Sequence, residues 1–254
     1  DNNKIKDLKF TSKIDLENLK LNLKPSLIDQ YVKNYNKFVM LKNNSIEIDY
    51  NNENLNIKGK SKYSLKDKND EIIYELSKKN KEYKFKTDAS LNNSHIVFKS
   101  FSYKKKNKNP ANIKLSGKYK KSRGITFEKI NYNEGKNNLY IKDLNFNKNH
   151  KLVNVNAIDL NYTNTNDKIN KINLERKDKK YKIIGEVFDS KKLIDELLKN
   201  SGNKSFIENF SNFSSEVSLD IEKTYIDNFS YFKNLKGKIK FRDNEIVNLN
   251  ISAL

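Results

Sequence analysis

The sequence predicts a mainly β protein, built as an extended, curled antiparallel sheet with one or two short amphipathic helices. Apolar and polar residues alternate through most of the chain, for example at Ile46, Ile48 and Tyr50, and this pattern is typical of strands with one dry and one wet face. Polar connectors recur at intervals of roughly ten to fifteen residues, which favours a long meander. The strands are not continuous apolar runs, so a parallel α/β sheet is not expected.

Composition limits the size of the core. Of 254 residues, 35% are hydrophobic and 33% charged, so we expect a thin, one-sided core. We expect one elongated repeating domain, with 1–178 and 179–254 as possible sub-units. The sequence begins at Asp1 without Met and ends at Leu254 inside an alternating pattern, so we expect it to be a piece of a longer protein. It contains no apolar run of about 18 residues, the length of a membrane-spanning helix.

Alternating apolar residues predict the individual strands. The residues between them are mostly Lys, Asn, Asp or Ser, which suits a solvent-facing side. In chain order, the predicted strands are marked by Ile46–Tyr50, Leu55–Ile57, Tyr83–Phe85, Ile96–Phe98, Ile113–Leu115, Ile125–Phe127, Leu139–Ile141, Val153–Val155, Ile158–Tyr162, Tyr181–Val187, Val217–Ile221, Ile239–Phe241 and Leu249–Ile251.

Asn and Asp are expected to form most turns. The chain contains only 7 Gly and 2 Pro, and both Asn and Asp tolerate turn conformations. The pair Asp243-Asn244 predicts a tight hairpin. The other predicted connectors are the short polar segments 66–70, 78–81, 104–109, 133–136 and 164–168.

Two segments break the alternation and predict helices. Pro25–Phe38 carries an apolar stripe behind an approximate capping box. In Tyr181–Lys199 a strand, interrupted at Gly185 by an expected bulge, runs into a second amphipathic helix. Asp189 or Ser190 is expected to accept a hydrogen bond from the first helical N–H groups.

Three strand segments share a short apolar pattern that leads into Gly-Lys or Gly-Lys-Ile, at Gly59, Gly117 and Gly237. Two interpretations stay open. Chance together with the abundance of lysine would produce this pattern. Strand repeats, each too narrow to bury its face alone, would produce it as well.

The formal net charge of +19 is typical of proteins that bind nucleic acid or anionic surfaces. Only Arg123, Arg176 and Arg242 are arginine, however, and phosphate and base recognition favours arginine. We therefore expect no specific nucleic-acid partner, and the excess of Lys, Asn and Ile is what the codon bias of an AT-rich genome would produce. A basic polyanion-binding or structural envelope module is the alternative function. Its aromatic residues would stack on bases, although they equally suit a β core.

No motif for catalysis or metal binding is found in the sequence. His95 and His150 lie in separate segments without a second ligand at metal-binding spacing, and the sequence contains no Cys. There is no nucleophile elbow, Gly-rich phosphate loop or zincin motif. Asp143, Asp159 and Asp189 could in principle supply a catalytic pair of carboxylates, but no spacing in the sequence singles out two of them. We therefore expect a protein that is not an enzyme, without catalytic residues, metal or cofactor.

A one-sided meander can close as a sandwich or barrel, or stay open as a curled sheet with an apolar groove. A groove would bind acyl chains, whose burial contributes about 0.8 kcal/mol per CH₂. In a closed sandwich the same residues would form an ordinary core. The residues expected to line the groove are Leu55, Ile57, Ile113, Leu115, Leu139, Ile141, Val153, Val155, Leu219, Ile221, Ile239 and Phe241.

The segment 184–194, IGEVFDSKKLI, resembles the G-x-x-F-D-[small]-x-x-[LI]-[LI] strand-to-helix signature of AsmA-like proteins, and in particular of their large YhdP-type branch, which is related to TamB. The resemblance covers 179–254 and is only compositional over 1–178. High lysine and low glycine content depart from the family pattern. The matching residues are Gly185, Phe188, Asp189, Leu193 and Ile194.

This resemblance implies a repeating β-groove protein of the diderm bacterial envelope. Such a protein would be anchored in the inner membrane through parts outside this chain and would extend through the periplasm. It would conduct phospholipid toward the outer membrane and so support outer-membrane integrity. The resemblance implies phospholipid acyl chains as ligands, carries no catalytic residue and indicates no partner protein.

Overall fold

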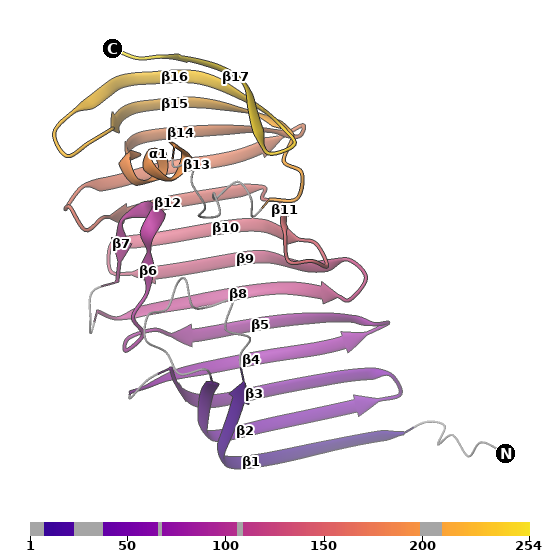
Figure 1. Ribbon diagram of the computed structural model, residues 1–254. Coiled ribbons are helices and arrows are strands. Elements are labelled where there is room, and N and C mark those ends of the chain that lie inside the picture. Colours follow the sequence, from indigo (N-terminus) through magenta and orange to yellow (C-terminus); the bar gives the residue numbers. More distant parts are fainter. Residues whose placement is uncertain (1–7, 23–37, 66–67, 106–108, 199–209) are drawn as a thin grey trace.

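The structure is a computed structural model that describes residues 8–22, 38–65, 68–105, 109–198 and 210–254. Within these residues a 15-stranded sheet stacks its strands in chain order, with β1 at one edge and β17 at the other (Figure 1). The sheet curves but does not close into a barrel. The prediction of a mainly β, extended and curled sheet is confirmed.

The strands of the main sheet are joined mostly by short connections. Two further strands and a 3₁₀ turn lie outside it, namely β6 (Val97–Phe98), η2 (Lys99–Phe101) and β7 (Tyr103–Lys104). The main sheet contains β1 (Lys9–Asn22), β2 (Phe38–Asn51), β3 (Asn54–Ser64), β4 (Asn69–Lys79), β5 (Glu82–Ser90), β8 (Ala111–Lys120), β9 (Gly124–Glu134), β10 (Asn137–Phe146), β11 (Leu152–Asn154), β12 (Ala157–Thr163), β13 (Ile169–Lys177), β14 (Lys180–Asp189), β15 (Ser215–Tyr225), β16 (Tyr231–Arg242) and β17 (Glu245–Ser252).

Four strands are additional to those predicted, namely β1, β4 and β13 in the main sheet and β7 beside it. In β1 the apolar spacing changes between Leu16 and Leu19, although both residues pair with β2, so its alternation is hidden. The connector predicted at 66–70 ends too late, because β4 already begins at Asn69. In β4 and β13 the apolar alternation is present but was overlooked, at Ile72, Tyr74 and Leu76 and at Ile172 and Leu174.

Among the described strands, all neighbours are antiparallel except β14 and β15, which run parallel and pair Tyr181 with Val217. The predicted antiparallel order is therefore incorrect at this one place. Parallel neighbours need a crossover connection, and the helix α1 (Lys191–Leu198) lies within that crossover. Pairing of β13 with β14 continues the sheet across the sub-unit boundary expected at residue 178.

The local structure of the strand-to-helix segment agrees with its prediction. The β13–β14 register shifts beside Gly185, where one extra residue of β14 forms the expected bulge. Asp189 Oδ1 accepts a hydrogen bond of 3.3 Å from the N–H of Lys191. The Ser190 hydroxyl instead donates to the carbonyl of Tyr225.

The helix α1 follows the inner strand β14, where the crossover to β15 begins, and it contacts η2. Leu193 and Ile194 are half-buried in it. The helix predicted at Pro25–Phe38 falls outside the described residues, apart from Phe38, which begins β2.

Asn and Asp supply the turn conformations, as predicted. Both central residues have positive φ angles in the two-residue turns Asn80-Lys81, Asp178-Lys179 and Asp243-Asn244. Positive φ at both positions is the type I′ geometry that matches the twist of a hairpin. The hairpin expected at Asp243-Asn244 is thereby confirmed.

The three glycines of the repeated segment lie beside larger residues on one face of the sheet. Gly59 pairs with Tyr74, and Gly117 pairs with Phe85. A Cβ atom at Gly237 would lie within 3 Å of the neighbouring strand. The shared pattern therefore has a shared packing role, because each position needs a small residue.

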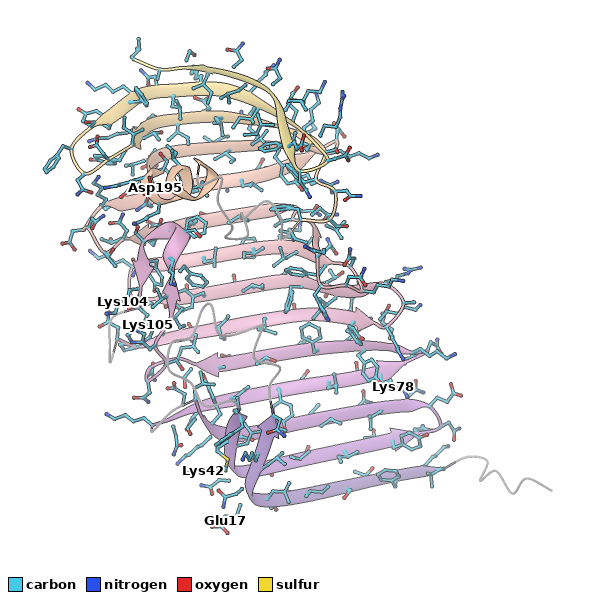
Figure 2. The ribbon with its side chains drawn as sticks, viewed as in Figure 1. Glu17, Lys42, Lys78, Lys104, Lys105 and Asp195 are labelled. Carbon is cyan, nitrogen blue, oxygen red and sulfur yellow. The ribbon has the colours of Figure 1, made fainter. Side chains whose placement is uncertain are left out.

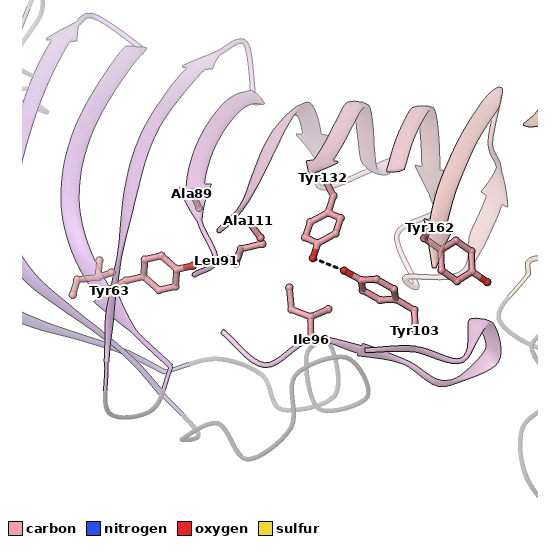
Figure 3. Close-up of a cluster of buried hydrophobic side chains, with 9 residues drawn as sticks. Tyr63, Ala89, Leu91, Ile96, Tyr103, Ala111, Tyr132 and Tyr162 are labelled. Atoms are coloured by element: carbon pink, nitrogen blue, oxygen red, sulfur yellow. Dashed lines mark hydrogen bonds between the residues drawn. The ribbon is translucent and has the colours of Figure 1, made fainter. Parts of the chain in front are cut away.

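The two ends of the strands differ. We call residues 91–105 the strap and the strand ends that they cover the strap rim. The opposite strand ends, where the three type I′ hairpins lie, are the hairpin rim. A smaller core of Val155, Tyr181 and Val217 also packs Phe213. The main core under the strap contains Leu41, Tyr63, Ala89, Leu91, Ile96, Tyr103, Ala111, Tyr132 and Tyr162 (Figure 3).

Replacing Gly117 by Ala is expected to lower the free energy of unfolding by about 1–3 kcal/mol, the usual cost of overpacking. The new Cβ would lie 2.2 Å from the backbone oxygen of Thr126, which cannot move without shifting the strand. Gly59→Ala is the matched control, because the three atoms nearest to its Cβ would all belong to the side chain of Tyr74, which can move more easily than a strand backbone. Urea unfolding measures both. An equal or larger loss at Gly59 would contradict the assignment.

Candidate apolar ligand-binding face

One face of the sheet carries a continuous row of apolar side chains. Cross-strand register places the row at right angles to the strands, and every member is half-buried. At a strand spacing of about 4.8 Å, the seven residues span roughly 29 Å, close to the hydrocarbon thickness of a bilayer. The row consists of Leu115, Ile130, Ile141, Ile158, Leu174, Ile183 and Leu219.

The same face continues to both edges of the sheet. On β1, Phe10 and Ile14 are exposed, and on β17 Leu249 and Ile251 are 58% and 45% exposed. Their register keeps them on the face that carries the row. Such exposure of large apolar side chains is typical of a surface that another apolar molecule covers.

The structure brings most of the predicted lining residues to this face. Val153 differs, because it lies in β11, off the main strand path, and is 42% exposed. Val155 is buried in the smaller core. The residues that register and alternation place on the apolar face are Leu55, Ile57, Ile113, Leu115, Leu139, Ile141, Leu219, Ile221, Ile239 and Phe241.

The strap covers this face along one rim only. Figure 3 shows Tyr132 pointing from the sheet toward Tyr103 of the strap, and Tyr63, Ile96 and Tyr162 belong to the same cluster. The Tyr103 ring stands edge-on to those of Tyr132 and Tyr162, with centroids 6.2 and 5.8 Å apart. The row described above lies nearer the middle of the strands and stays half-buried. Sequence reasoning missed the strap, because its only signal was the pair Ile96 and Phe98.

A buried polar network fixes the strap to the sheet. The Tyr103 hydroxyl donates to Glu134 Oε2 at 2.5 Å and lies 2.7 Å from the Tyr132 hydroxyl. Asn109 and Asn137 also donate to the Glu134 carboxylate. Lys105 is 1% exposed, and its Nζ donates to a strap carbonyl at 3.1 Å. A carboxylate buried with several donors is stable, whereas one that loses a donor is costly.

A second network holds the end of β14. Asn170, which is fully buried, accepts a 2.7 Å hydrogen bond from the N–H of Asp189 and donates to the carbonyl of Lys168. Asn164 Nδ2 donates to Asp189 Oδ2 at 2.7 Å, and Lys168 Nζ lies 4.0 Å from the same oxygen. Asp189 therefore has a structural role at the start of the crossover.

Charged side chains of the opposite face alternate in sign across the strands. Register aligns Glu47, Lys58, Glu75 and Lys86 on four successive strands. Opposite charges at such positions attract. The outward face is thus a mixed ladder of charge over these strands. Figure 2 shows the side chains along the sheet, including that of Lys78, which shares its face with Leu55.

The two histidines that were considered as metal ligands are not brought together. His95 lies in the strap, and His150 lies in a turn of the opposite rim. Within the described ranges no group of three or more His, Asp or Glu residues could hold a metal ion. No helix in those ranges is long and apolar enough to cross a membrane.

Comparison with known proteins found no matching family model, curated protein or solved structure.

Replacing Tyr103 by Phe is expected to lower the free energy of unfolding by about 1–3 kcal/mol, because the buried Glu134 carboxylate loses a donor. Hydrogen exchange should also accelerate across residues 96–105. Tyr119→Phe, at a 37% exposed tyrosine, is the control and should leave both measurements unchanged. If Tyr103→Phe matches the wild-type protein in both, the network does not hold the strap.

The protein is expected to lose stability above about pH 10. Burial raises the pKa of Tyr132 to about 12 and raises the pKa of Tyr63, Tyr103 and Tyr162 as well. A phenol with a raised folded-state pKa stabilises the fold below its unfolded pKa, and this contribution falls as pH rises through the folded value. Burial lowers the pKa of Lys105, which acts in the opposite direction below its unfolded pKa.

Urea midpoints measured from pH 9 to pH 12 test this expectation, with Tyr132→Phe as the comparison. The variant should show a shallower decline, because it lacks one of the titrating phenols. A midpoint that stays constant across this range would contradict the assignment.

Proposed function

We propose that this chain is a non-enzymatic lipid-conduit segment, whose apolar face binds acyl chains. The observation that carries the proposal is the half-buried row from Leu115 to Leu219, which crosses seven strands in register. Acyl chains need apolar area and no specific polar contact, and each CH₂ that they bury contributes about 0.8 kcal/mol. A row of roughly 29 Å offers this area without interruption.

The row keeps solvent exposure although it adjoins both cores. The strap packs at one rim. Five residues of the row pack against the smaller core at the other rim and stay half-buried, namely Ile141, Ile158, Leu174, Ile183 and Leu219. Apolar residues on β1 and β17 extend the face toward both edges. A chain on this face would therefore have room to move from strand to strand.

The proposed cellular setting rests on the resemblance of 184–194 to AsmA-like proteins. In that setting the segment lies in the periplasm of a Gram-negative bacterium. The full-length protein is anchored in the inner membrane and carries phospholipid toward the outer membrane. The alternating charges of the outward face favour this setting over general polyanion binding, because they do not form one positive patch across Glu47, Lys58, Glu75 and Lys86.

A photo-crosslinking residue at Ile141 is expected to capture phospholipid in cell envelopes. The same residue at Tyr140, the next position along β10, is the matched control, since alternation turns it to the opposite face. Mass spectrometry of the crosslinked protein gives the lipid yield, which should be at least about tenfold higher at Ile141. Equal yields at the two positions, or none at Ile141 in a functional protein, would exclude the conduit.

A further inference from the structure

Asparagine side chains form a ladder across four strands of the outward face. Cross-strand register pairs Asn112 of β8 with Asn133 of β9, and Asn133 with Asn138 of β10. Asn138 pairs in turn with Asn161 of β12. Alternation turns all four outward, because a neighbour of each along its strand packs in the main core. Asparagine makes up 42 of the 254 residues, so chance alone would rarely align four of them.

A second line of polar residues runs beside this ladder, two positions further along the strands. We call the ladder and this line together the amide strip. At a strand spacing of about 4.8 Å, the five strands of the strip span roughly 19 Å, which is long enough for a ligand of several linked units. In register order, the second line consists of Asn131, Tyr140, Asp159 and Asn173 on β9, β10, β12 and β13.

The six asparagine amides of the strip have no hydrogen-bond partner among the described residues. Asparagines with a structural role differ, since Asn170 and Asn164 both bond to Asp189. Aligned asparagines can also stabilise a sheet by bonding to one another, but no such bond joins these six in the described strands. Each amide therefore has one acceptor and two donor hydrogens available to a ligand.

Tyr140 places an aromatic ring in the middle of the strip. Its register neighbours are Asn131 on one side and Asp159 on the other, and its side chain is half-buried. No aromatic ring contacts it among the described residues. A tyrosine presents an apolar ring face and a polar tip, and this combination suits a sugar ring, which has an apolar face and a rim of hydroxyl groups.

Two lysines without acidic partners border the strip. Lys129 and Lys142 face each other on β9 and β10, and Lys129 lies two positions from Asn131. Both lysines are exposed, and neither pairs with an acidic residue in the described ranges. Lys114 at the end of the strip differs, because it pairs with Asp88 at 2.9 Å. Like charges that face each other across strands repel, so an anionic ligand group between Lys129 and Lys142 would be favourable.

The geometry points to a carbohydrate site: we propose that the amide strip binds a linear glycan that carries carboxylate groups. The amides and Asp159 bond to sugar hydroxyls, Tyr140 stacks on a sugar ring, and Lys129 and Lys142 hold a carboxylate. A nucleic acid would need cations at its phosphates, whereas the central positions of the strip are amides. A protein partner would need an apolar centre. The inference is independent of the proposed function, because it uses the opposite face of the sheet.

The first test removes two neighbouring amides, with Asn133→Ala and Asn138→Ala in one variant. The control variant carries Asn56→Ala and Asn250→Ala, which remove two amides from the outward face of distant strands. Isothermal titration calorimetry measures the binding of a hyaluronan hexasaccharide, which carries carboxylates, and of chitohexaose, which is uncharged. Urea unfolding verifies that both variants are folded.

The amide variant should bind both hexasaccharides about tenfold more weakly than the wild-type protein, as the loss of two hydrogen bonds predicts. The control should bind them as the wild-type protein does. Equal affinities in the two variants would overturn the proposal, and so would a wild-type protein that binds neither hexasaccharide.

The second test removes the two lysines, with Lys129→Gln and Lys142→Gln in one variant. Its control carries Lys182→Gln and Lys238→Gln, which remove the same charge from exposed positions of β14 and β16. The lysine variant should bind the hyaluronan hexasaccharide about tenfold more weakly and chitohexaose equally well, because only the first ligand carries carboxylates. Unchanged hyaluronan affinity would overturn the carboxylate assignment.

Competition separates a glycan site from a general polyanion site. A short single-stranded DNA should displace the hyaluronan hexasaccharide only at far higher concentration, because it does not match the amides. Displacement at a similar concentration, with the amide variant binding the DNA as the wild-type protein does, would overturn the proposal in favour of a polyanion.

Discussion

Cross-strand register is the constraint on which the rest of this structure depends. Side chains alternate between the two faces of each strand, so a slip of one residue would carry every apolar side chain of that strand to solvent. The chain holds this register through several bulges, including those beside Gly117 and Gly185. Each bulge takes up one extra residue and restores the alternation beyond it. The apolar row and the outward charge ladder both follow from this single property.

The parallel pair β14–β15 organises the C-terminal third of the sheet. It requires a crossover, and the crossover brings α1 to the strap rim and returns the chain to the hairpin rim. Buried Asp189 and Asn170 secure the point where β14 ends. Because the chain returns to the hairpin rim, β15 begins there between the turn that joins β13 to β14 and the turn that joins β16 to β17. One departure from the meander thus accounts for both the helix and this isolated strand start.

The local sequence pattern predicts most of the strands, the type I′ turns and the strand-to-helix segment, because these elements depend on residues that are close in sequence. The strands β4 and β13 also alternate locally, at Ile72, Tyr74 and Leu76 and at Ile172 and Leu174, so the pattern was sufficient to predict them and was overlooked. The strap is a different case. Tyr103 is buried by Tyr132 and Tyr162, which lie far from it in sequence, and no local period encodes such a contact. Val153 was predicted to line the groove because it alternates with Val155. The strand β11 that contains it pairs with β10 but lies off the main strand path.

The two rims differ in how their charged groups are placed. An apolar segment laid on an apolar face has little to fix its position, since hydrophobic contact is not directional. Hydrogen bonds from Tyr103 and Asn109 to buried Glu134 supply that direction, and they are effective only in a site that excludes water. At the hairpin rim the cations Lys179 and Arg242 stay exposed. One rim therefore buries its charged groups with hydrogen-bond partners under the strap, while the other leaves these cations exposed to solvent.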